Sequence, residues 1–224
     1  GDIGKSIPKC LLDINGKTLL EKHVQTFRNI GLNEIFVVIG DKGECWTKEN
    51  QDKINKIHKN VIINYANHKT HNSYSLKLVL DAIDHDDIFV TDGDVILDPE
   101  IINNLVLDKR TIILSEPKKN NEFEGNKIIS DENGRVLELS RNLKNFNQNR
   151  ENLMYCGVSK IRKEDLEILK NILSKKEYIH KDLGFIFNEL INTIPVYHYS
   201  SKKYFQINRP EELDKARKLL LNTH

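Results

Sequence analysis

Two carboxylates stand two residues apart directly after a short apolar run. Residues 88–90 (Ile-Phe-Val) lead into Thr-Asp-Gly-Asp, which places Asp92 and Asp94 at the carboxyl end of a predicted strand. Open α/β sheets bind ligands in the crevice beyond these strand ends, and carboxylate oxygens suit Mg²⁺ or Mn²⁺ bridged to phosphates. Asp-Gly is also common in plain turns. This spacing therefore indicates either a metal and phosphate site or an ordinary strand end.

A lysine directly follows a proline near the start of the chain. Residues 5–17 read Lys-Ser-Ile-Pro-Lys-Cys-Leu-Leu-Asp-Ile-Asn-Gly-Lys. Because proline fixes its own φ, Pro8 helps to hold Lys9, whose ammonium is a point charge suited to phosphate. The chain has 34 lysines and arginines, and most of them must be solvated. Lys9 therefore indicates phosphate chemistry only in combination with the other motifs.

A third polar segment precedes the last predicted helix. Residues 206–213 read Gln-Ile-Asn-Arg-Pro-Glu-Glu-Leu. Locally this is a helix start, with Asn208 or Arg209 at the cap, Pro210 in the first turn and acidic residues at the positive end of the helix dipole. A cap role for the backbone does not exclude a functional side chain at Asn208.

A fourth polar segment also leads into a helix. Residues 70–76 read Thr-His-Asn-Ser-Tyr-Ser-Leu. The beginning of a helix offers free N–H groups to an anion or to the edge of a base. The alternative interpretation is that Ser73 is a simple N-cap, and the residues themselves favour it.

Alternating strand and helix patterns must position these segments. They predict an α/β fold with a Rossmann-like, doubly wound and mostly parallel sheet. An Asn-Gly turn signal at Asn133 and Gly134 predicts an inserted β-hairpin. Predicted helices cover 19–30, 48–58, 73–83, a short segment from 98, 163–173, 179–191 and 210–221. Predicted strands cover 35–39, 61–65, 88–90, 111–115, 127–130, 136–139, 154–161, 196–199 and 204–207, with loops at 116–126 and 142–152.

Composition excludes several classes of protein. The 224 residues carry a formal net charge of +1, which argues against a basic nucleic-acid binder and offers no field for anionic membranes. No apolar run approaches the roughly 20 residues that span a bilayer, and none resembles a signal peptide. Cys10, Cys45 and Cys156 are scattered and odd in number, so they predict neither a disulfide framework nor a zinc cluster. A reducing, cytoplasmic setting fits best.

Taken in order, the motifs resemble those of a known family. They are Pro8-Lys9-x-Leu-Leu-x-Ile-x-Gly16-Lys17-x-Leu-Leu-Glu21, then Gly31-x-x-Glu34-Ile35, Asn72-x-Tyr74-Ser75, Asp92-Gly93-Asp94-Val95 and Ile207-Asn208-x-Pro210-Glu211-Glu212-Leu213. Each motif is weak singly, but the ordered set spans nearly the whole chain. It is similar to the nucleoside-diphosphate-sugar pyrophosphorylase-like nucleotidyltransferases, and most of all to their phosphocholine cytidylyltransferase branch.

The resemblance implies roles for three residues in particular. Lys9 matches the lysine that contacts the triphosphate and offsets charge at the α-phosphate. Asp94 matches the acid that binds Mg²⁺, or Mn²⁺ in its place, so both residues are candidate catalytic residues. Asn208 stands where the second metal ligand is usually Asp but can be Asn, and an Asn there removes one negative charge from the metal site.

The resemblance also implies a nucleotide site and points to an acceptor site. The nucleotide-binding candidates are Asn72, Ser73, Tyr74, Ser75 and Asp92. The resemblance offers Lys127 and Arg141 as candidate contacts to an acceptor phosphate, although no motif fixes them. An aromatic cage for a quaternary ammonium would draw on Trp46, Tyr155 and Tyr178, which are as readily explained by ordinary packing.

The pattern predicts one domain over residues 1–224. We expect a nucleotide-binding half at about 1–115, an acceptor half at about 116–200 and a C-terminal helix at 210–221. Members of the family begin with a strand and a Gly-rich loop ahead of the Pro-Lys element, whereas only a few residues precede that element here. We therefore expect the chain to lack its first strand and most of that loop.

The function that the resemblance implies is CTP-dependent transfer of CMP to a small phosphorylated acceptor. The acceptor would be phosphocholine, aminoethylphosphonate or a similar metabolite, and the products a CDP-linked compound and pyrophosphate. Three alternatives stay open: a sugar-1-phosphate nucleotidyltransferase that uses another nucleoside triphosphate, a metal-dependent nucleotide-sugar glycosyltransferase, and a non-catalytic nucleotide-binding domain. Enzymes of this kind often form homo-oligomers, and no nucleic-acid or membrane partner is expected.

Overall fold

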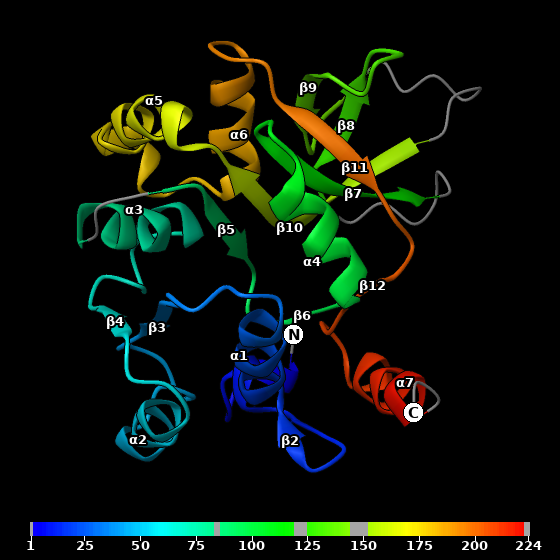
Figure 1. Cartoon of the computed structure of the whole chain (residues 1–224). Coiled ribbons are helices and arrows are strands. Elements are labelled where there is room, and N and C mark those ends of the chain that lie inside the picture. The colour runs from blue at the N-terminus through cyan, green and yellow to red at the C-terminus, as the bar shows by residue number, and fades with distance from the viewer. Residues whose placement is uncertain (1, 83–85, 119–124, 144–151, 222–224) are drawn as a thin grey trace. The chain divides into compact units, whose positions relative to one another are not determined.

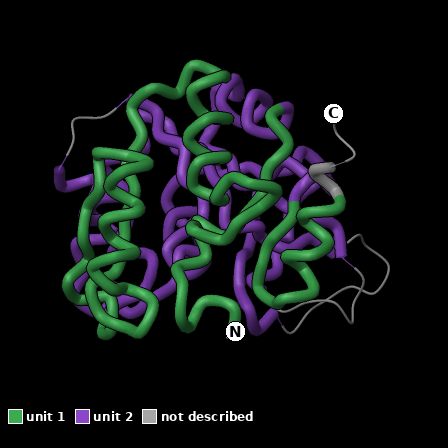
Figure 2. The backbone as a smooth tube through the Cα atoms, turned by 90° about the horizontal axis from the view of Figure 1, so that it is seen from below, with its two compact units in different colours: residues 1–69, 93–99, 205–224 green, residues 70–92, 100–204 purple. Residues whose placement is uncertain are grey.

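The computed structural model describes residues 2–82, 86–118, 125–143 and 152–221. The chain divides into two compact units, each built from separate stretches of sequence (Figure 2). Unit 1 comprises residues 1–69, 93–99 and 205–224, and unit 2 comprises residues 70–92 and 100–204. The predicted nucleotide and acceptor halves divide the chain in a different way and stay predictions.

Unit 1 contains short strands and three helices (Figure 1). The first helix begins where Thr18 and Glu21 form a capping box, in which each side chain accepts the other residue's backbone N–H. It ends before Gly31, whose φ of 89° suits glycine. The helices are α1 (Leu19–Asn29), α2 (Lys48–Ile57) and α7 (Pro210–Leu221), and the strands are β1 (Asp13–Ile14), β2 (Lys17–Thr18), β3 (Val37–Gly40), β4 (Val61–Asn64), β6 (Val95–Leu97) and β12 (Tyr204–Gln206).

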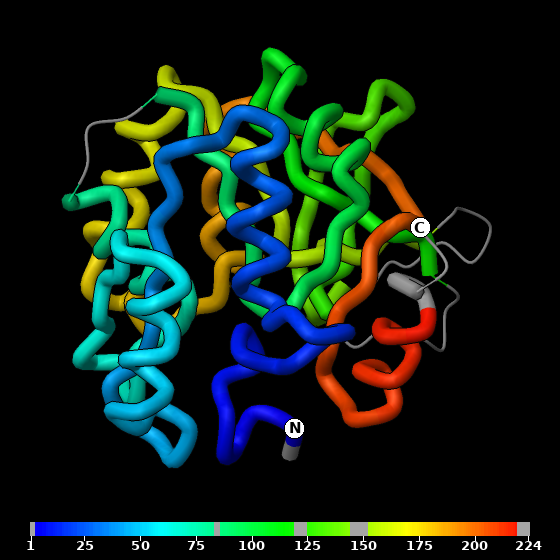
Figure 3. Tube along the Cα trace, turned by 60° about the horizontal axis from the view of Figure 1, so that its bottom comes forward, coloured from blue at the N-terminus to red at the C-terminus, as the bar shows by residue number. Residues whose placement is uncertain are grey.

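Segments near the two ends of the chain, blue and red in Figure 3, both contribute side chains to the core of unit 1. Its buried members come from the N-terminal segment, from α1 and from the C-terminal segment: Leu12, Ile14, Leu19, Ile207 and Ala216. The guanidinium of Arg217 donates to the carbonyl oxygen of Asp13 at 3.1 and 3.2 Å. In return, Asn15 Nδ2 donates to the carbonyl oxygen of Arg217 at 2.8 Å. Helix α7 is thereby fastened to the β1–β2 hairpin.

Unit 2 is built on a six-stranded mixed sheet. Its order is β11-β7-β10-β8-β9, and β5 also pairs with β10. Helices α3, α5 and α6 contribute apolar side chains to the core on this sheet. The strands are β5 (Ile88–Thr91), β7 (Ile112–Lys118), β8 (Lys127–Ser130), β9 (Val136–Ser140), β10 (Asn152–Ile161) and β11 (Tyr197–Ser200). The helices are α3 (Asn72–Ala82), α4 (Pro99–Leu107), α5 (Lys163–Leu173) and α6 (Leu183–Ile191), with a 3₁₀ turn at Lys176–Tyr178.

The α/β class and the Rossmann-like fold are confirmed, but the sheet is mixed where a mostly parallel one was predicted. Strand β10 runs antiparallel to β5, β7 and β8. Strand β3 pairs in parallel with β4, and β11 pairs in parallel with β7. Strand β7 continues to Lys118, three residues into the segment predicted as a loop, and pairs there with the start of β10. The rest of the two predicted loops falls largely on 119–124 and 144–151, outside the described residues.

The predicted β-hairpin is present as β8 and β9. Asp131 Oδ1 accepts the backbone N–H groups of Asn133 and Arg135, each at 2.9 Å. Gly134 has a φ of 77°, a conformation that glycine adopts without strain. Helix α6 begins at Leu183, not at 179 as predicted, because Asp182 caps it by accepting the N–H of Phe185 at 2.8 Å.

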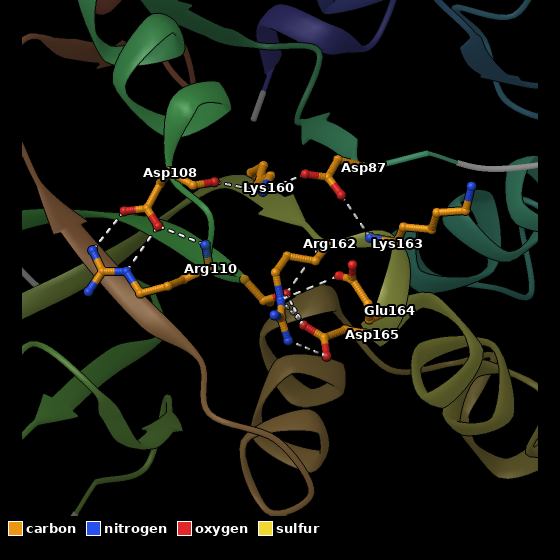
Figure 4. Close-up of polar contacts among 9 residues, drawn as sticks. Asp87, Asp108, Arg110, Lys160, Arg162, Lys163, Glu164 and Asp165 are labelled. Carbon is orange, nitrogen blue, oxygen red and sulfur yellow. Dashed lines mark hydrogen bonds and ion pairs between the residues drawn. The ribbon is translucent and has the colours of Figure 1, made fainter.

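Ionic contacts join the ends of several elements of unit 2 (Figure 4). Lys160 is 2% exposed, and its ammonium donates to the carbonyl oxygen of Asp108 and to Asp87 Oδ2, both at 2.7 Å. Arg162 binds both carboxylate oxygens of Asp165, at 2.9 and 3.0 Å. Burial raises the pKa of Asp87, but hydrogen bonds from Lys160 and Lys163 outweigh it, so the net pKa is lowered. The contacts therefore tie β5, β10, α4 and α5 together.

Candidate functional site

Three of the predicted site residues meet in unit 1. The ammonium of Lys9 donates to Asp94 Oδ2 at 2.7 Å and to Asn208 Oδ1 at 2.8 Å. The side chains of Lys9 and Asp94 are 23% and 15% exposed, so both are reachable from solvent. Lys9 is 85 and 199 positions away from these two partners in sequence. The fold of unit 1 therefore assembles this cluster from three distant segments.

A short 3₁₀ turn presents Lys9. Pro8 has a φ of −55° and is followed by the turn Lys9–Leu11. The N–H of Leu11 donates to the carbonyl oxygen of Pro8 at 2.8 Å, and the N–H of Leu12 donates to that of Lys9 at 3.1 Å. Leu11 and Leu12 are both buried. The apolar pair anchors the turn, which leaves the Lys9 side chain directed to the polar cluster.

Backbone contacts on both sides hold Asp94. The carbonyl oxygen of Asp94 accepts the N–H of Ile207 at 2.9 Å, and the next residue, Val95, is fully buried. His23 Nε2 hydrogen-bonds the carbonyl oxygen of Val95. Burial of the His23 ring lowers its pKa, while the Val95 contact and the charge of Asp94 act in the opposite direction. A neutral His23 therefore links α1 to the segment that carries Asp94.

Glu212 leaves the Asn208 side chain available for the cluster. Its carboxylate accepts the backbone N–H of Asn208 at 2.6 Å and that of Arg209 at 2.8 Å. Helix α7 begins at Pro210, so Glu212 is its third residue and caps it in the way a capping box does. Of the two predicted cap positions, Arg209 is therefore the one at the cap, and the Asn208 side chain accepts a hydrogen bond from Lys9.

The motif analysis did not single out Gln206. Its Nε2 donates to Asp94 Oδ1 at 3.3 Å, on the carboxylate oxygen that Lys9 does not hold. Phe205 and Ile207 pack in the core of unit 1, and alternate residues of an extended strand face opposite sides. The alternation of apolar and polar residues over 205–208 is therefore the signal that could have paired Gln206 with Asn208.

The cluster fits a divalent cation. A carboxylate oxygen of Asp94 and the amide oxygen of Asn208 both lie within 2.8 Å of the Lys9 ammonium, so a cationic group already occupies the space between two hard oxygen donors. Such donors suit Mg²⁺, which usually takes one or two protein ligands and completes its shell with water and substrate phosphates. Among the described residues no group of three or more His, Cys, Asp or Glu side chains is arranged for a metal.

The predicted nucleotide-binding segment lies at the start of α3 in unit 2. Asn72 is the first residue of the helix. Its Oδ1 accepts the N–H of Leu183 at 3.0 Å and lies 2.8 Å from His71 Nδ1, while its Nδ2 lies 3.5 Å from Asp92 Oδ1. Asn72 therefore joins three segments of unit 2: the start of α3, the turn after β5 and the start of α6.

Ser73 lies inside the first turn of α3, so its interpretation as the N-cap is wrong. It is 1% exposed, and its hydroxyl donates to the carbonyl oxygen of Lys181 at 2.6 Å. The carbonyl oxygen of Tyr178 lies 3.2 Å from the same hydroxyl. Tyr74 and Ser75 are half-buried. The Ser73 hydroxyl is thus engaged with the chain ahead of α6, whereas Tyr74 and Ser75 are partly accessible.

Asp92 lies directly against a glycine of β10. The N–H of Asp92 donates to the carbonyl oxygen of Gly157 at 2.9 Å. Gly157 has a φ of 70°, and a Cβ at this position would lie 2.2 Å from Asp92 Oδ2. Both the backbone conformation and the close approach require glycine here. Sequence reasoning did not single out Gly157.

The five residues left undecided as acceptor contacts have structural partners. Tyr155 is 8% exposed and packs on Phe187, and Tyr178 packs edge-on against Phe185 and donates to Glu189. The Trp46 indole covers Gly40. Arg141 Nη2 pairs with Asp182 Oδ2 at 3.2 Å, and Lys127 lies in β8. Packing accounts for the two tyrosines.

The cysteines offer no activated nucleophile. All three are free thiols. Burial raises the pKa of Cys10 to about 12 and also raises the pKa values of Cys45 and Cys156. A nucleophilic cysteine needs a lowered pKa, so the raised values argue against a nucleophilic role for these thiols.

Comparison with known proteins decides the family. A sequence model of the MobA-like NTP transferase domain matches residues 3–122, more than half of the chain. The chain belongs to this family. The protein is therefore a nucleotidyltransferase, and the resemblance found in its motifs is confirmed.

Individual relatives of this nucleotidyltransferase are distant but nearly full-length. A probable UDP-N-acetylglucosamine pyrophosphorylase of Acanthamoeba polyphaga mimivirus is 25% identical and covers 96% of this chain and 91% of its own. A similar fold occurs in CTP:phosphocholine cytidylyltransferase of Streptococcus pneumoniae, with 18% sequence identity and a TM-score of 0.75 over 95% of this chain and 90% of that chain. The inositol-1-phosphate CTP transferase of T. maritima has 14% identity and a TM-score of 0.75 over 98% of this chain and 89% of that chain. A putative glucose-1-phosphate thymidylyltransferase of Bacillus anthracis has 14% identity and a TM-score of 0.76 over 99% of this chain and 90% of that chain.

No described helix of this nucleotidyltransferase has the length and apolar character that crossing a bilayer requires.

Proposed function

We propose that this nucleotidyltransferase transfers CMP from CTP to a small phosphorylated acceptor, with Mg²⁺, and releases pyrophosphate. The observation that carries the proposal is the cluster in which the Lys9 ammonium holds Asp94 Oδ2 and Asn208 Oδ1. It combines a positive charge for phosphate with two oxygen donors for a metal. Phosphoryl-transfer enzymes act by such positioning and charge neutralisation.

The reaction needs no general base from the protein. An oxygen of the acceptor phosphate attacks the α-phosphate of CTP, the new P–O bond forms, and the bond to the pyrophosphate leaving group breaks. The attacking oxygen is already ionised at neutral pH. Lys9 would then offset the negative charge that grows on the α-phosphate.

Asp94 and Asn208 are the residues that would hold the metal. Mg²⁺ bound there would neutralise phosphate charge and orient the triphosphate. Asn208 contributes an uncharged oxygen, so Asp94 provides the one formal negative charge of the pair. Asn72, Tyr74, Ser75 and Asp92 are proposed to bind the nucleotide, and Ser73 to support that segment through its buried hydroxyl.

Two fold relatives are named for the use of CTP, which favours a cytidylyltransferase. The named activities of the mimivirus relative and of the B. anthracis protein favour the second candidate, transfer to a sugar-1-phosphate from another nucleoside triphosphate. Phosphocholine, aminoethylphosphonate and related metabolites remain the proposed acceptors under the first candidate.

The decisive experiment is a matrix of four nucleoside triphosphates against phosphocholine, aminoethylphosphonate, inositol-1-phosphate and sugar-1-phosphates, scored by pyrophosphate release with and without Mg²⁺. We expect release with CTP and one phosphorylated acceptor, and none in EDTA. Release with UTP or dTTP and a sugar-1-phosphate would support the second candidate instead. Release of a nucleoside diphosphate from a nucleotide sugar would indicate a glycosyltransferase, and nucleotide binding without any product a non-catalytic domain.

A further inference from the structure

We propose that Gln206 is a positioning residue that sets the orientation of the Asp94 carboxylate and thereby the affinity of the site for its divalent cation. This inference rests on the proposed function, in which Asp94 binds the metal. Gln206 Nε2 donates to Asp94 Oδ1 at 3.3 Å, while the Lys9 ammonium takes Asp94 Oδ2 at 2.7 Å. The two oxygens of Asp94 are thus assigned to different partners.

The amide of Gln206 can face Asp94 in one way only. A carboxylate accepts hydrogen bonds and has none to donate, so the nitrogen of the amide must point to Oδ1. With Oδ1 engaged by Gln206, Oδ2 is the oxygen that lies on the side of Lys9 and Asn208. The donor therefore selects which carboxylate oxygen is presented to a cation.

This selection matters because the torsion that turns an aspartate carboxylate is soft. The χ2 angle of Asp is broad and roughly twofold, unlike the staggered torsions of an aliphatic chain. The backbone contacts of Asp94, through its carbonyl oxygen to Ile207 N–H, fix the main chain but leave this torsion unconstrained. Hydrogen bonds from Lys9 to Oδ2 and from Gln206 to Oδ1 constrain it. Because Lys9 must turn to phosphate in the proposed reaction, the bond from Gln206 is the one that remains.

The local strand also places Gln206 correctly. Phe205 and Ile207 pack in the core of unit 1, so Gln206 and Asn208 share the opposite side of the extended chain. The same short segment thus supplies one proposed metal ligand and the group that orients the other. Partners that orient metal ligands in this way contribute about 10- to 100-fold to metal affinity or activity.

Mn²⁺ alone is the probe that tests this inference, measured as free Mn²⁺ by electron paramagnetic resonance with the full chain. Gln206→Met keeps the side-chain length and removes the donor, and we expect its Mn²⁺ dissociation constant to rise at least about 10-fold. Gln206→Asn keeps an amide that is one methylene too short, and should show a similar loss. Gln25→Met is the matched control, because exposed Gln25 contacts Lys17 and lies on α1.

The same variants should separate metal affinity from other defects. The melting temperature should stay at the wild-type value, and turnover of Gln206→Met should recover as Mg²⁺ is raised, with an unchanged KM for CTP at saturating Mg²⁺. Mn²⁺ binding by both Gln206 variants within twofold of wild type would overturn the positioning role even if the enzyme turns over. If the wild-type protein binds Mn²⁺ and the Gln206 variants bind it more weakly, but no substrate pair releases pyrophosphate, the positioning role is upheld and the proposed function is contradicted.

Discussion

Lys9 holds its charge between a carboxylate and an amide oxygen, at 2.7 and 2.8 Å. In the proposed reaction the same ammonium has to meet phosphate oxygens. Its partners must therefore release it when nucleotide and metal arrive, which is consistent with a long, flexible side chain that stays 23% exposed.

Replacing Lys9 tests its catalytic role directly. Lys9→Ala should lower kcat for pyrophosphate release on the order of 10² to 10³, the usual effect of removing one stabiliser of transition-state charge. Lys53→Ala, which removes an exposed lysine paired with Glu49 on α2, should leave kcat unchanged. Turnover of Lys9→Ala at the wild-type rate would rule out the assignment.

Asn208 is proposed as an uncharged ligand of the metal, and adding a negative charge at this position is informative. Asn208→Asp should lower the Mg²⁺ concentration for half-maximal activity on the order of tenfold, because a second carboxylate adds Coulombic attraction for the cation. Asn33→Asp adds the same charge at an exposed position of unit 1 and should change nothing. An unchanged Mg²⁺ requirement in Asn208→Asp would mean that this residue does not contact the metal.

The motifs predicted most of the residues in the cluster but not their contacts. Lys9, Asp94 and Asn208 are recognisable because residue type and order in the chain carry the resemblance, and the structure brings them together. Their roles stay predictions. Gln206 was missed because its contact with Asp94 joins segments 112 positions apart, and the alternation over 205–208 indicates only which side of the chain Gln206 shares with Asn208.

At the level of elements, periodic patterns predicted which segments are helical. The helices 163–173 and 210–221 have the predicted bounds, whereas α6 begins four residues late, since Asp182 provides the cap. The β1–β2 hairpin was missed because each strand has two residues, although Asn15 and Gly16, with φ of 57° and 82°, form its turn.

Strand direction was the feature that sequence could not supply. Strand β10 is buried along most of its length, which is typical of a parallel strand covered on both faces. Here the burial comes from antiparallel neighbours on both sides and from helices packed on the sheet. A continuous apolar run indicates that a strand is buried, but it does not indicate whether the neighbouring strands are parallel or antiparallel to it.

Replacing Gly157 tests how strand β10 supports Asp92. Gly157→Ala should destabilise unit 2 by about 2 kcal/mol or more and weaken nucleotide binding, because its φ of 70° is strained for alanine and its Cβ would meet Asp92 Oδ2. Gly31 also has a positive φ, 89°, but a Cβ added there would have no atom within 4 Å. Gly31→Ala therefore measures the backbone cost alone, about 1–2 kcal/mol. Urea unfolding and nucleotide titration measure the two effects. Equal losses in both variants would show that the Asp92 contact is unimportant.

For the whole molecule, two histidines make stability depend on pH. Burial lowers the pKa of His198, opposed by the charge of Asp131, and burial also lowers the pKa of His23. His198 lies between two hydroxyls, with Nδ1 2.9 Å from Ser115 Oγ and Nε2 3.1 Å from Ser130 Oγ. Below pH 6.5 the unfolded chain binds protons at these histidines that the folded chain resists, so stability falls as pH falls.

The midpoint of urea unfolding should therefore decrease between pH 7.5 and pH 5. The carboxylates of Asp87 and Asp108, whose pKa values are lowered, become protonated only below this pH window. His198→Gln should flatten the dependence, and His68→Gln, at an exposed position, should reproduce the wild-type curve. A midpoint that is constant over this window would contradict the histidine assignment.

The division of unit 1 among three stretches of the chain has a consequence for biosynthesis. Residues 100–204 of unit 2 are synthesised after Lys9 and Asp94 and before Gln206 and Asn208. Closing a loop of this length delays contacts that join the ends of a chain. We expect the cation site to be the last functional part of the nascent protein to mature, after the sheet of unit 2 has formed around β10.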